Sequence, residues 1–264
     1  MEHTYWQKQA SEKPLFPDIA WSKPEMRSFA GKLAIVGGNK LGFAGVAEAY
    51  GTALEAGVGE VRVLMPDALK SSIPKAFGEA LFAPSNPSGS LAKDSLSELR
   101  TLGEWADSVL LIGDAGRNSE TAVVYEQFIQ QYDGLLTLTR DSIDLMKNNP
   151  SLLAERPNTL LVASFAQVQK LFQGVYYPKI MTFSMQLTQA VEALHKFTIT
   201  YPVTIATLHN DSLIVAYGGE VVTTKWENPM AIWRGTTATK ATCYWLWNKE
   251  KPLEAVSASL LAQN

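Results

Sequence analysis

The feature that most constrains this chain is a strand, a glycine-rich loop, a helix and a second strand in direct succession. Leu33–Val36 is a short apolar run that ends at Gly37, as a buried strand does. Ala44–Ala56 has small and apolar residues at helical spacing, and two glycines follow it. Val61–Met65 is a second apolar run. A helix that joins two buried strands predicts a parallel pair and an α/β fold.

The same alternation continues along the chain, and it predicts a mostly parallel sheet flanked by helices in three layers. Close-set strands with a Gly218-Gly219 turn predict a small antiparallel edge in the C-terminal third. The further expected strands are 109–112, 135–138, 160–163, 203–207, 213–216 and 220–223. The further expected helices are 91–106, 120–131, 142–148, 166–172, 180–197, 231–247 and 253–262.

Composition narrows the class of protein. The 264 residues carry a net charge of −3, so no broad basic surface for nucleic acid or an anionic membrane is expected. No signal sequence or long apolar run occurs, and Cys243 is the single cysteine, which together predict a cytoplasmic protein without a membrane span. The three histidines lie far apart with no Cys or His at ligand spacing, so no metal site is expected.

The loop Gly37–Gly45 joins the first strand to its helix and is the first candidate binding element. Glycines let a ligand approach the backbone, and the helix N-terminus beyond offers N–H groups to an anion. A dinucleotide-binding motif would need a different glycine spacing, although Asp67 lies where that motif has its acidic residue after the second strand. The loop is not a P-loop either, because no Gly-Lys-Ser/Thr follows. A tight turn without a ligand remains the alternative.

Residues 31–67 (GKLAIVGGNKLGFAGVAEAYGTALEAGVGEVRVLMPD) resemble the opening of the ATP- or ADP-dependent NAD(P)H-hydrate dehydratases, which have a ribokinase-like fold. The resemblance continues in the same order at 108–117 (SVLLIGDAGR), 136–146 (LTLTRDSIDLM), 156–161 (RPNTLL) and 228–231 (NPMA). It spans 31–264, which we expect to be a single ribokinase-like domain behind an N-terminal arm of residues 1–30.

The resemblance implies a metabolite-repair lyase. In that family ATP or ADP with Mg²⁺ phosphorylates hydrated NADH or NADPH, and loss of phosphate restores the nicotinamide. Matching positions imply substrate contacts at Gly37, Gly38, Asn39, Gly45, Val46, Gly116, Asp141 and Ser164. They imply nucleotide contacts at Asn228, Arg234, Gly235 and Thr236.

The chain departs from the family at its catalytic motifs. Thr237 stands at the position of the aspartate base, and a threonine cannot accept a proton at neutral pH. Arg234 and Thr236 replace glycines of the anion hole, and Ser164 replaces a histidine. These departures favour a non-catalytic or strongly divergent relative, a pseudoenzyme with a binding or scaffolding role. An active divergent dehydratase and a small-molecule kinase with a relocated base are the alternatives.

Two further expectations concern Arg234 and assembly. An arginine at a helix N-terminus needs an anion or a carboxylate, so we expect Arg234 to turn inward and pair with a group such as Asp141. The N-terminal arm and the tryptophan-rich segment 226–247 predict a homo-oligomer or a complex with a related subunit.

Overall fold

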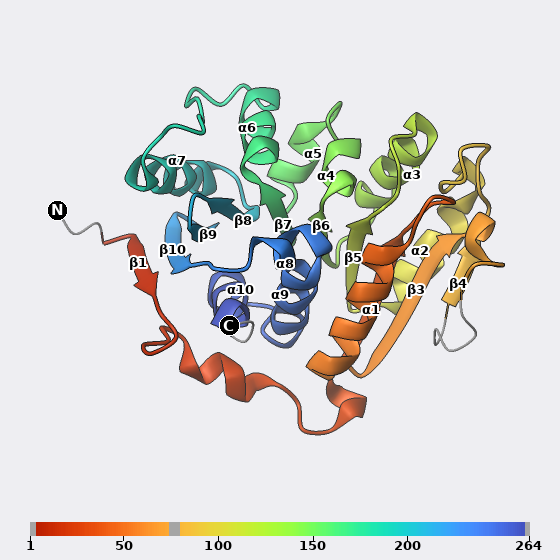
Figure 1. The fold of residues 1–264 in the computed structure, drawn as a ribbon, viewed down its shortest axis with the longest axis horizontal. Coiled ribbons are helices and arrows are strands. Elements are labelled where there is room, and N and C mark those ends of the chain that lie inside the picture. The colour runs from red at the N-terminus through yellow and green to blue at the C-terminus, as the bar shows by residue number, and fades with distance from the viewer. Residues whose placement is uncertain (1–3, 74–79, 262–264) are drawn as a thin grey trace.

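The computed structural model describes residues 4–73 and 80–261. Within them the strands form a sheet of ten, in the order β1-β10-β9-β8-β7-β6-β5-β2-β3-β4 (Figure 1). Neighbours from β4 to β8 are parallel, and β9 is antiparallel to both β8 and β10. The expected mostly parallel sheet with a small antiparallel edge is therefore confirmed. The strands are β1 (Trp6–Gln9), β2 (Lys32–Gly37), β3 (Glu60–Pro66), β4 (Ala80–Ala83), β5 (Ser108–Gly113), β6 (Leu135–Thr139), β7 (Thr159–Ser164), β8 (Thr204–His209), β9 (Ser212–Tyr217) and β10 (Glu220–Lys225).

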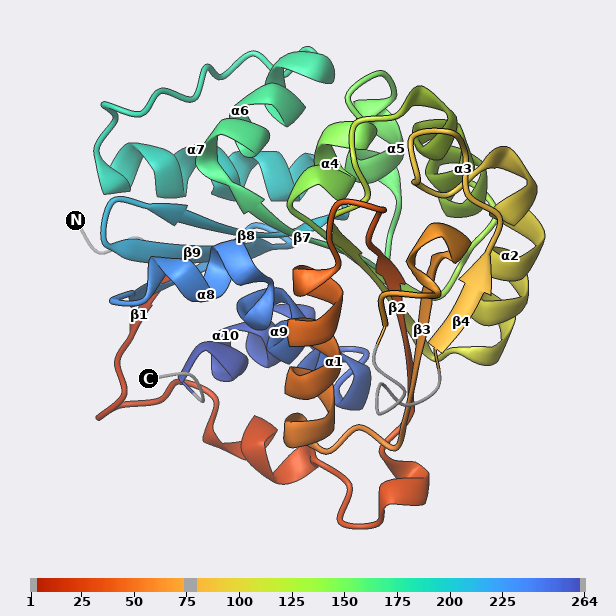
Figure 2. The ribbon, with the colours of Figure 1, turned by 45° about the vertical axis from the view of Figure 1, so that its right-hand side comes forward.

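Helices cover both faces of the sheet and make the three layers, as Figure 2 shows from a second side. One face carries α1 (Ala44–Ala56), α8 (Pro229–Arg234), α9 (Thr236–Trp247) and α10 (Pro252–Leu261). The other carries α2 (Leu96–Trp105), α3 (Ser119–Ile129), α4 (Asp141–Leu145), α5 (Pro150–Glu155), α6 (Phe165–Gly174) and α7 (Leu187–Thr200). Among the described residues, no helix is both long and apolar enough to cross a membrane.

The central strand β5 shows how the core is divided. All six of its residues are buried. Val109 and Leu111 belong to the apolar cluster beneath α2–α7, whereas Leu110 and Ile112 belong to the cluster beneath α1, α9 and α10. Successive side chains of a strand point to opposite faces, so a strand between two helical layers must be apolar throughout.

The first strand joins the far edge of the sheet, although residues 1–30 were expected to form only an arm with turns. β1 pairs parallel with β10, with Trp6 opposite Val221. The Trp6 indole Nε1 donates to Thr223 Oγ1 at 2.9 Å. The buried Gln9 donates to the backbone carbonyl of Ser257 at 2.9 Å, which ties the strand to α10.

Three other element boundaries differ from the expected ones. The helix expected over 180–197 begins at Leu187. The single helix expected over 231–247 is two helices, because Gly235 takes φ +93° between α8 and α9. The helix expected over 91–106 begins at Leu96, after a short 3-10 turn. β4 and α5 were not expected at all.

Candidate functional site

The carboxyl ends of β2 and β5 bring two predicted loops together. The Gly38 N–H donates to the Gly113 carbonyl at 3.0 Å. The Asn39 side-chain amide donates to the Asp114 carbonyl at 2.5 Å. The glycine loop after β2 and the loop after β5 therefore form one wall, at the sheet edge where open α/β folds bind ligands.

An ion pair from two neighbouring strand ends lies against the beginning of α1. Arg140 follows β6, and its Nη2 lies 2.5 Å from Oδ1 of Asp114, which follows β5. Asp114 Oδ2 accepts a hydrogen bond from the Gly45 backbone N–H at 2.6 Å. A Cβ at position 45 would collide with Arg140 Nη1, so a larger residue there would have to displace the guanidinium. The carboxylate of Asp114 thus takes the position that a helix N-terminus offers to an external anion.

Arg140 holds this position with a strained backbone. Its φ of 58° and ψ of −138° fall in a region that glycine adopts and other residues avoid. Such a conformation costs about 1–3 kcal/mol unless neighbouring contacts compensate for it. Asp114 also has a positive φ, of 54°. Strained residues at two adjacent strand ends are typical of functional sites.

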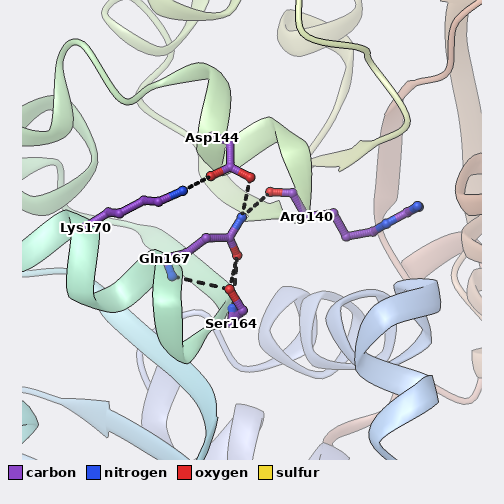
Figure 3. Close-up of polar contacts among 5 residues, drawn as sticks. All are labelled: Arg140, Asp144, Ser164, Gln167 and Lys170. Carbon is purple, nitrogen blue, oxygen red and sulfur yellow. Dashed lines mark hydrogen bonds and ion pairs between the residues drawn. The ribbon is translucent and has the colours of Figure 1, made fainter. Parts of the chain in front are cut away.

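The N-terminus of α6 fixes the backbone of Arg140 (Figure 3). The Gln167 side-chain amide donates to the Arg140 carbonyl at 2.7 Å and to Asp144 Oδ2 at 3.1 Å. Gln167 Oε1 accepts from the backbone N–H of Ser164 at 3.0 Å, which forms a capping box. Lys170 Nζ lies 3.4 Å from Asp144 Oδ1. In Figure 3 the Arg140 side chain points away from this network. Its guanidinium makes the ion pair with Asp114.

Asp141 is a carboxyl group of the site with a raised pKa. Burial raises its pKa above the ordinary 3.8, and the charge of Asp114 raises it further. The backbone N–H groups of Gly116 and Asp114 and the Arg140 guanidinium oppose the shift. Asp141 Oδ2 accepts the Gly116 N–H at 3.1 Å, while the buried Oδ1 has no hydrogen bond of ordinary geometry within the described residues. A carboxyl group in this state is able to hold or exchange a proton.

The junction of α8 and α9 carries the predicted nucleotide positions. Thr236 Oγ1 donates to Glu48 Oε1 of α1 at 3.2 Å, so a carboxylate also lies beside the N-terminus of α9. Thr237 is fully buried. Arg234 ends α8 instead of beginning α9; it is exposed and has no ion pair within the described residues. The expected inward pairing of Arg234 with Asp141 is therefore wrong, and Arg140 is the arginine that pairs at the site.

Other predicted site residues have partners within the fold. Val46 is fully buried beneath Gly37. Asn228 caps the far end of α8, where its side chain accepts the Ala231 N–H at 3.3 Å. Ser164 caps α6 through Gln167. The strand-end site contains Gly37, Gly38, Asn39, Gly45, Gly116 and Asp141.

Glu48 was not among the predicted site residues, and no individual role was predicted for Asp114 or Arg140, although both belong to loops expected at the strand ends. Asp114 and Arg140 each follow a buried apolar strand directly, and a charged residue there in a parallel sheet is a usable signal. Nothing in the local sequence around Glu48 indicates its contact, because Thr236 lies 188 residues away.

A carboxylate of the protein lies beside each of the two helix N-termini, where it disfavours a bare phosphate group. Asp114 accepts the Gly45 N–H at α1, and Glu48 stands beside Thr236 at α9. Each carboxylate would repel a phosphate oxygen at short range. At α1 the Asp114 carboxylate would have to leave the Gly45 N–H before a phosphate oxygen could accept from that N–H.

No family model matches the sequence, and no curated protein matches it. Solved structures do match. A ribokinase-like superfamily protein from Enterococcus faecalis superposes with a TM-score of 0.74 at 13% identity, covering 100% of this chain and 88% of the other. A Streptococcus mutans protein gives 0.69 at 16% identity, covering 92% and 85%.

An ADP/ATP-dependent NAD(P)H-hydrate dehydratase from Bacillus subtilis, co-crystallised with ATP and Mg²⁺ and soaked with CoA, gives a TM-score of 0.63 at 15% identity. The match covers 93% of this chain and 85% of that one. At such identities the likeness concerns the fold. The chain has a ribokinase-like fold, and the expected resemblance to this group of proteins is confirmed at that level.

Proposed function

We propose that this ribokinase-like chain is a non-catalytic relative of the NAD(P)H-hydrate dehydratases, with a binding role in place of nucleotide-driven dehydration. The observation that carries the proposal is the Arg140–Asp114 pair. It occupies the beginning of α1 with a carboxylate bonded to the Gly45 N–H at 2.6 Å. A site that supplies its own anion has little affinity for a phosphorylated substrate.

The position of the catalytic base supports the same proposal. The resemblance puts Thr237 where the family has an aspartate, and Thr237 is fully buried in the first turn of α9. A hydroxyl group cannot take a proton from a substrate at neutral pH without a stronger base beside it. Glu48 adds negative charge next to the same helix end, where a transferred phosphoryl group would need stabilisation.

The test is an assay of the purified chain with hydrated NADH, Mg²⁺ and either ATP or ADP. We expect no recovery of the dihydronicotinamide absorbance above the rate without protein. Calorimetry with each nucleotide should show weak or undetectable binding. Prompt recovery of the absorbance that depends on nucleotide would overturn the proposal.

An active enzyme with a relocated base is the second candidate, and Asp141 is the observation that favours it. Its raised pKa and the strained backbone of its neighbour Arg140 are both common at catalytic sites. If activity toward hydrated NADH or a hydroxyl-bearing substrate is found, Asp141→Asn should abolish it. Thr237→Val would then leave the activity intact.

The proposal keeps three expectations about the chain as a whole. Residues 31–264 act as one domain with residues 1–30 as an arm, the protein is cytoplasmic, and it forms a homo-oligomer or a complex with a related subunit. Trp21 and Phe29 of the arm and Trp233 of α8 are exposed and apolar, which supports a contact surface. Light scattering of the purified protein, alone and with a catalytically active relative, tests the assembly.

A further inference from the structure

Two hollows lie on either side of α4 and share a wall. One, of about 340 Å³, lies between α4, α5 and α6, and the other, of about 440 Å³, lies between α3 and α4. Both are lined by Asp144, Met146, Lys147 and Lys170. We call the pair of hollows the α4 cleft. Each hollow is within the size range of small-molecule sites.

The hollow beside α6 is mainly apolar. Ile143, Leu153 and Leu171 line it, and all three are at least nine-tenths buried. Gly174 closes it against Pro150, where an added Cβ would lie 2.6 Å from the proline Cγ. These tightly placed side chains form a preformed surface that suits an aromatic or aliphatic group.

The hollow beside α3 is more polar, and its three acidic side chains each have an ion-pair or hydrogen-bond partner. Asp144 lies 3.4 Å from Lys170 Nζ, Glu126 Oε1 accepts the Asn149 amide at 2.9 Å, and Asp141 accepts the Gly116 N–H.

Two basic side chains that line this hollow have no partner among the described residues. Lys147 and Arg117 line it, both are exposed, and neither has a hydrogen bond or ion pair within the described ranges. The hollow has three acidic and three basic side chains, so its formal charge is zero. Lys147 and Arg117 are its exposed basic groups without a partner, and they are therefore the groups able to bind an incoming anion.

We propose that the α4 cleft binds a small organic anion, in which a phosphate or carboxylate meets Lys147 and Arg117 and an apolar group enters the hollow beside α6. This site adjoins the strand-end site, with which it shares Asp141, but it uses neither the N-terminus of α1 nor that of α9, so it goes beyond the proposed function. It holds whether or not the chain has dehydratase activity.

The test uses calorimetry on the full chain with four probes. We expect 1-naphthyl phosphate or 1-naphthoate to bind, and which of the two binds tighter identifies the anionic group. Methyl phosphate, which lacks the ring, and 1-naphthol, which lacks the charge, should each bind about tenfold more weakly, since each loses one part of the interaction.

The double variant Lys147→Ala/Arg117→Ala should weaken the better probe by about tenfold or more, because both charge-assisted contacts are lost. Lys179→Ala, an exposed lysine outside the cleft, is the matched control and should bind like the parent. Both basic positions are exposed, so the double variant is expected to fold. Equal binding of 1-naphthol, equal binding by the double variant, or no binding of either aromatic anion overturns the proposal. None of these readouts depends on the dehydratase assay.

Discussion

The guanidinium of Arg140 lies 2.5 Å from the carboxylate of Asp114, and together they cover Gly45 at the start of α1. The two residues follow adjacent parallel strands, and both have a positive φ. The side-chain exposures of 26% and 18% leave the pair partly screened by solvent. Its main effect is therefore to occupy the site, with a modest contribution to stability.

The backbone strain at Arg140 can be separated from its ion pair by comparing two substitutions. Arg140→Gly and Arg140→Ala both remove the guanidinium, but only glycine adopts φ 58° and ψ −138° without strain. We expect the glycine variant to have the higher free energy of unfolding, by about 1–2 kcal/mol. Urea unfolding of the two variants measures the difference. Equal stabilities would show that the backbone at this position is not strained.

Gln167 should be intolerant of an acidic substitute. Its side-chain amide donates to the Arg140 carbonyl and to Asp144, and a glutamate at neutral pH can donate to neither. We expect Gln167→Glu to lower the free energy of unfolding by about 2–3 kcal/mol at neutral pH. The loss should shrink in acid, where the introduced carboxyl group is protonated. Gln173→Glu is the control, because Gln173 is exposed on the same helix and its side chain has no hydrogen bond within the described residues. An equal loss there would contradict the assigned role of Gln167.

Asp141 should make stability depend on pH. Its pKa is raised in the folded state, chiefly by burial, so the folded chain keeps a proton that the unfolded chain has released. The free energy of unfolding therefore falls as pH rises from the unfolded pKa, near 3.8, through the folded one, and it stays lower above that window. Asp141→Asn removes this dependence. Unfolding curves of both proteins across mildly acidic pH should diverge, and parallel curves would contradict the shift.

Opening the α1 site should require both members of the pair. In Asp114→Ala/Arg140→Gly the Gly45 N–H loses its internal carboxylate and becomes available to an external anion. We expect inorganic pyrophosphate to bind this variant about tenfold tighter than the parent, measured by calorimetry. Arg234→Gly/Thr236→Gly should behave like the parent, because Arg234 is exposed and lies outside the pair. If only that second variant bound pyrophosphate more tightly, the residues that prevent anion binding would be those at α9 instead of the Asp114–Arg140 pair.

Local patterns predicted the central part of the sheet. Leu33–Val36, Ala44–Ala56 and Val61–Met65 were correctly assigned, because strands buried on both faces are apolar throughout and glycines mark their ends. The four-residue β1 has no such run, and its partner β10 lies more than two hundred residues away. Pairing over that distance leaves no sign in the local sequence.

The site was harder to predict because its contacts also join residues that lie far apart in the sequence. The glycine loop and Asp141 were found because they match family motifs. The role of Arg140 depends on a positive φ and on a hydrogen bond from Gln167, 27 residues further along the chain. Neither a backbone angle nor a contact between two loops follows from residue type alone. A charged residue directly after a strand can therefore indicate that a site is present, but not how its side chains are arranged.

The pairing of β1 with β10 sets an order of events during synthesis. Trp6 leaves the ribosome 217 residues before Thr223, its hydrogen-bond partner. β1 therefore has no partner strand while the parallel centre of the sheet is synthesised and begins to fold. Domains generally fold from the N-terminal side as they emerge, but here β1 cannot dock before β10 has been made.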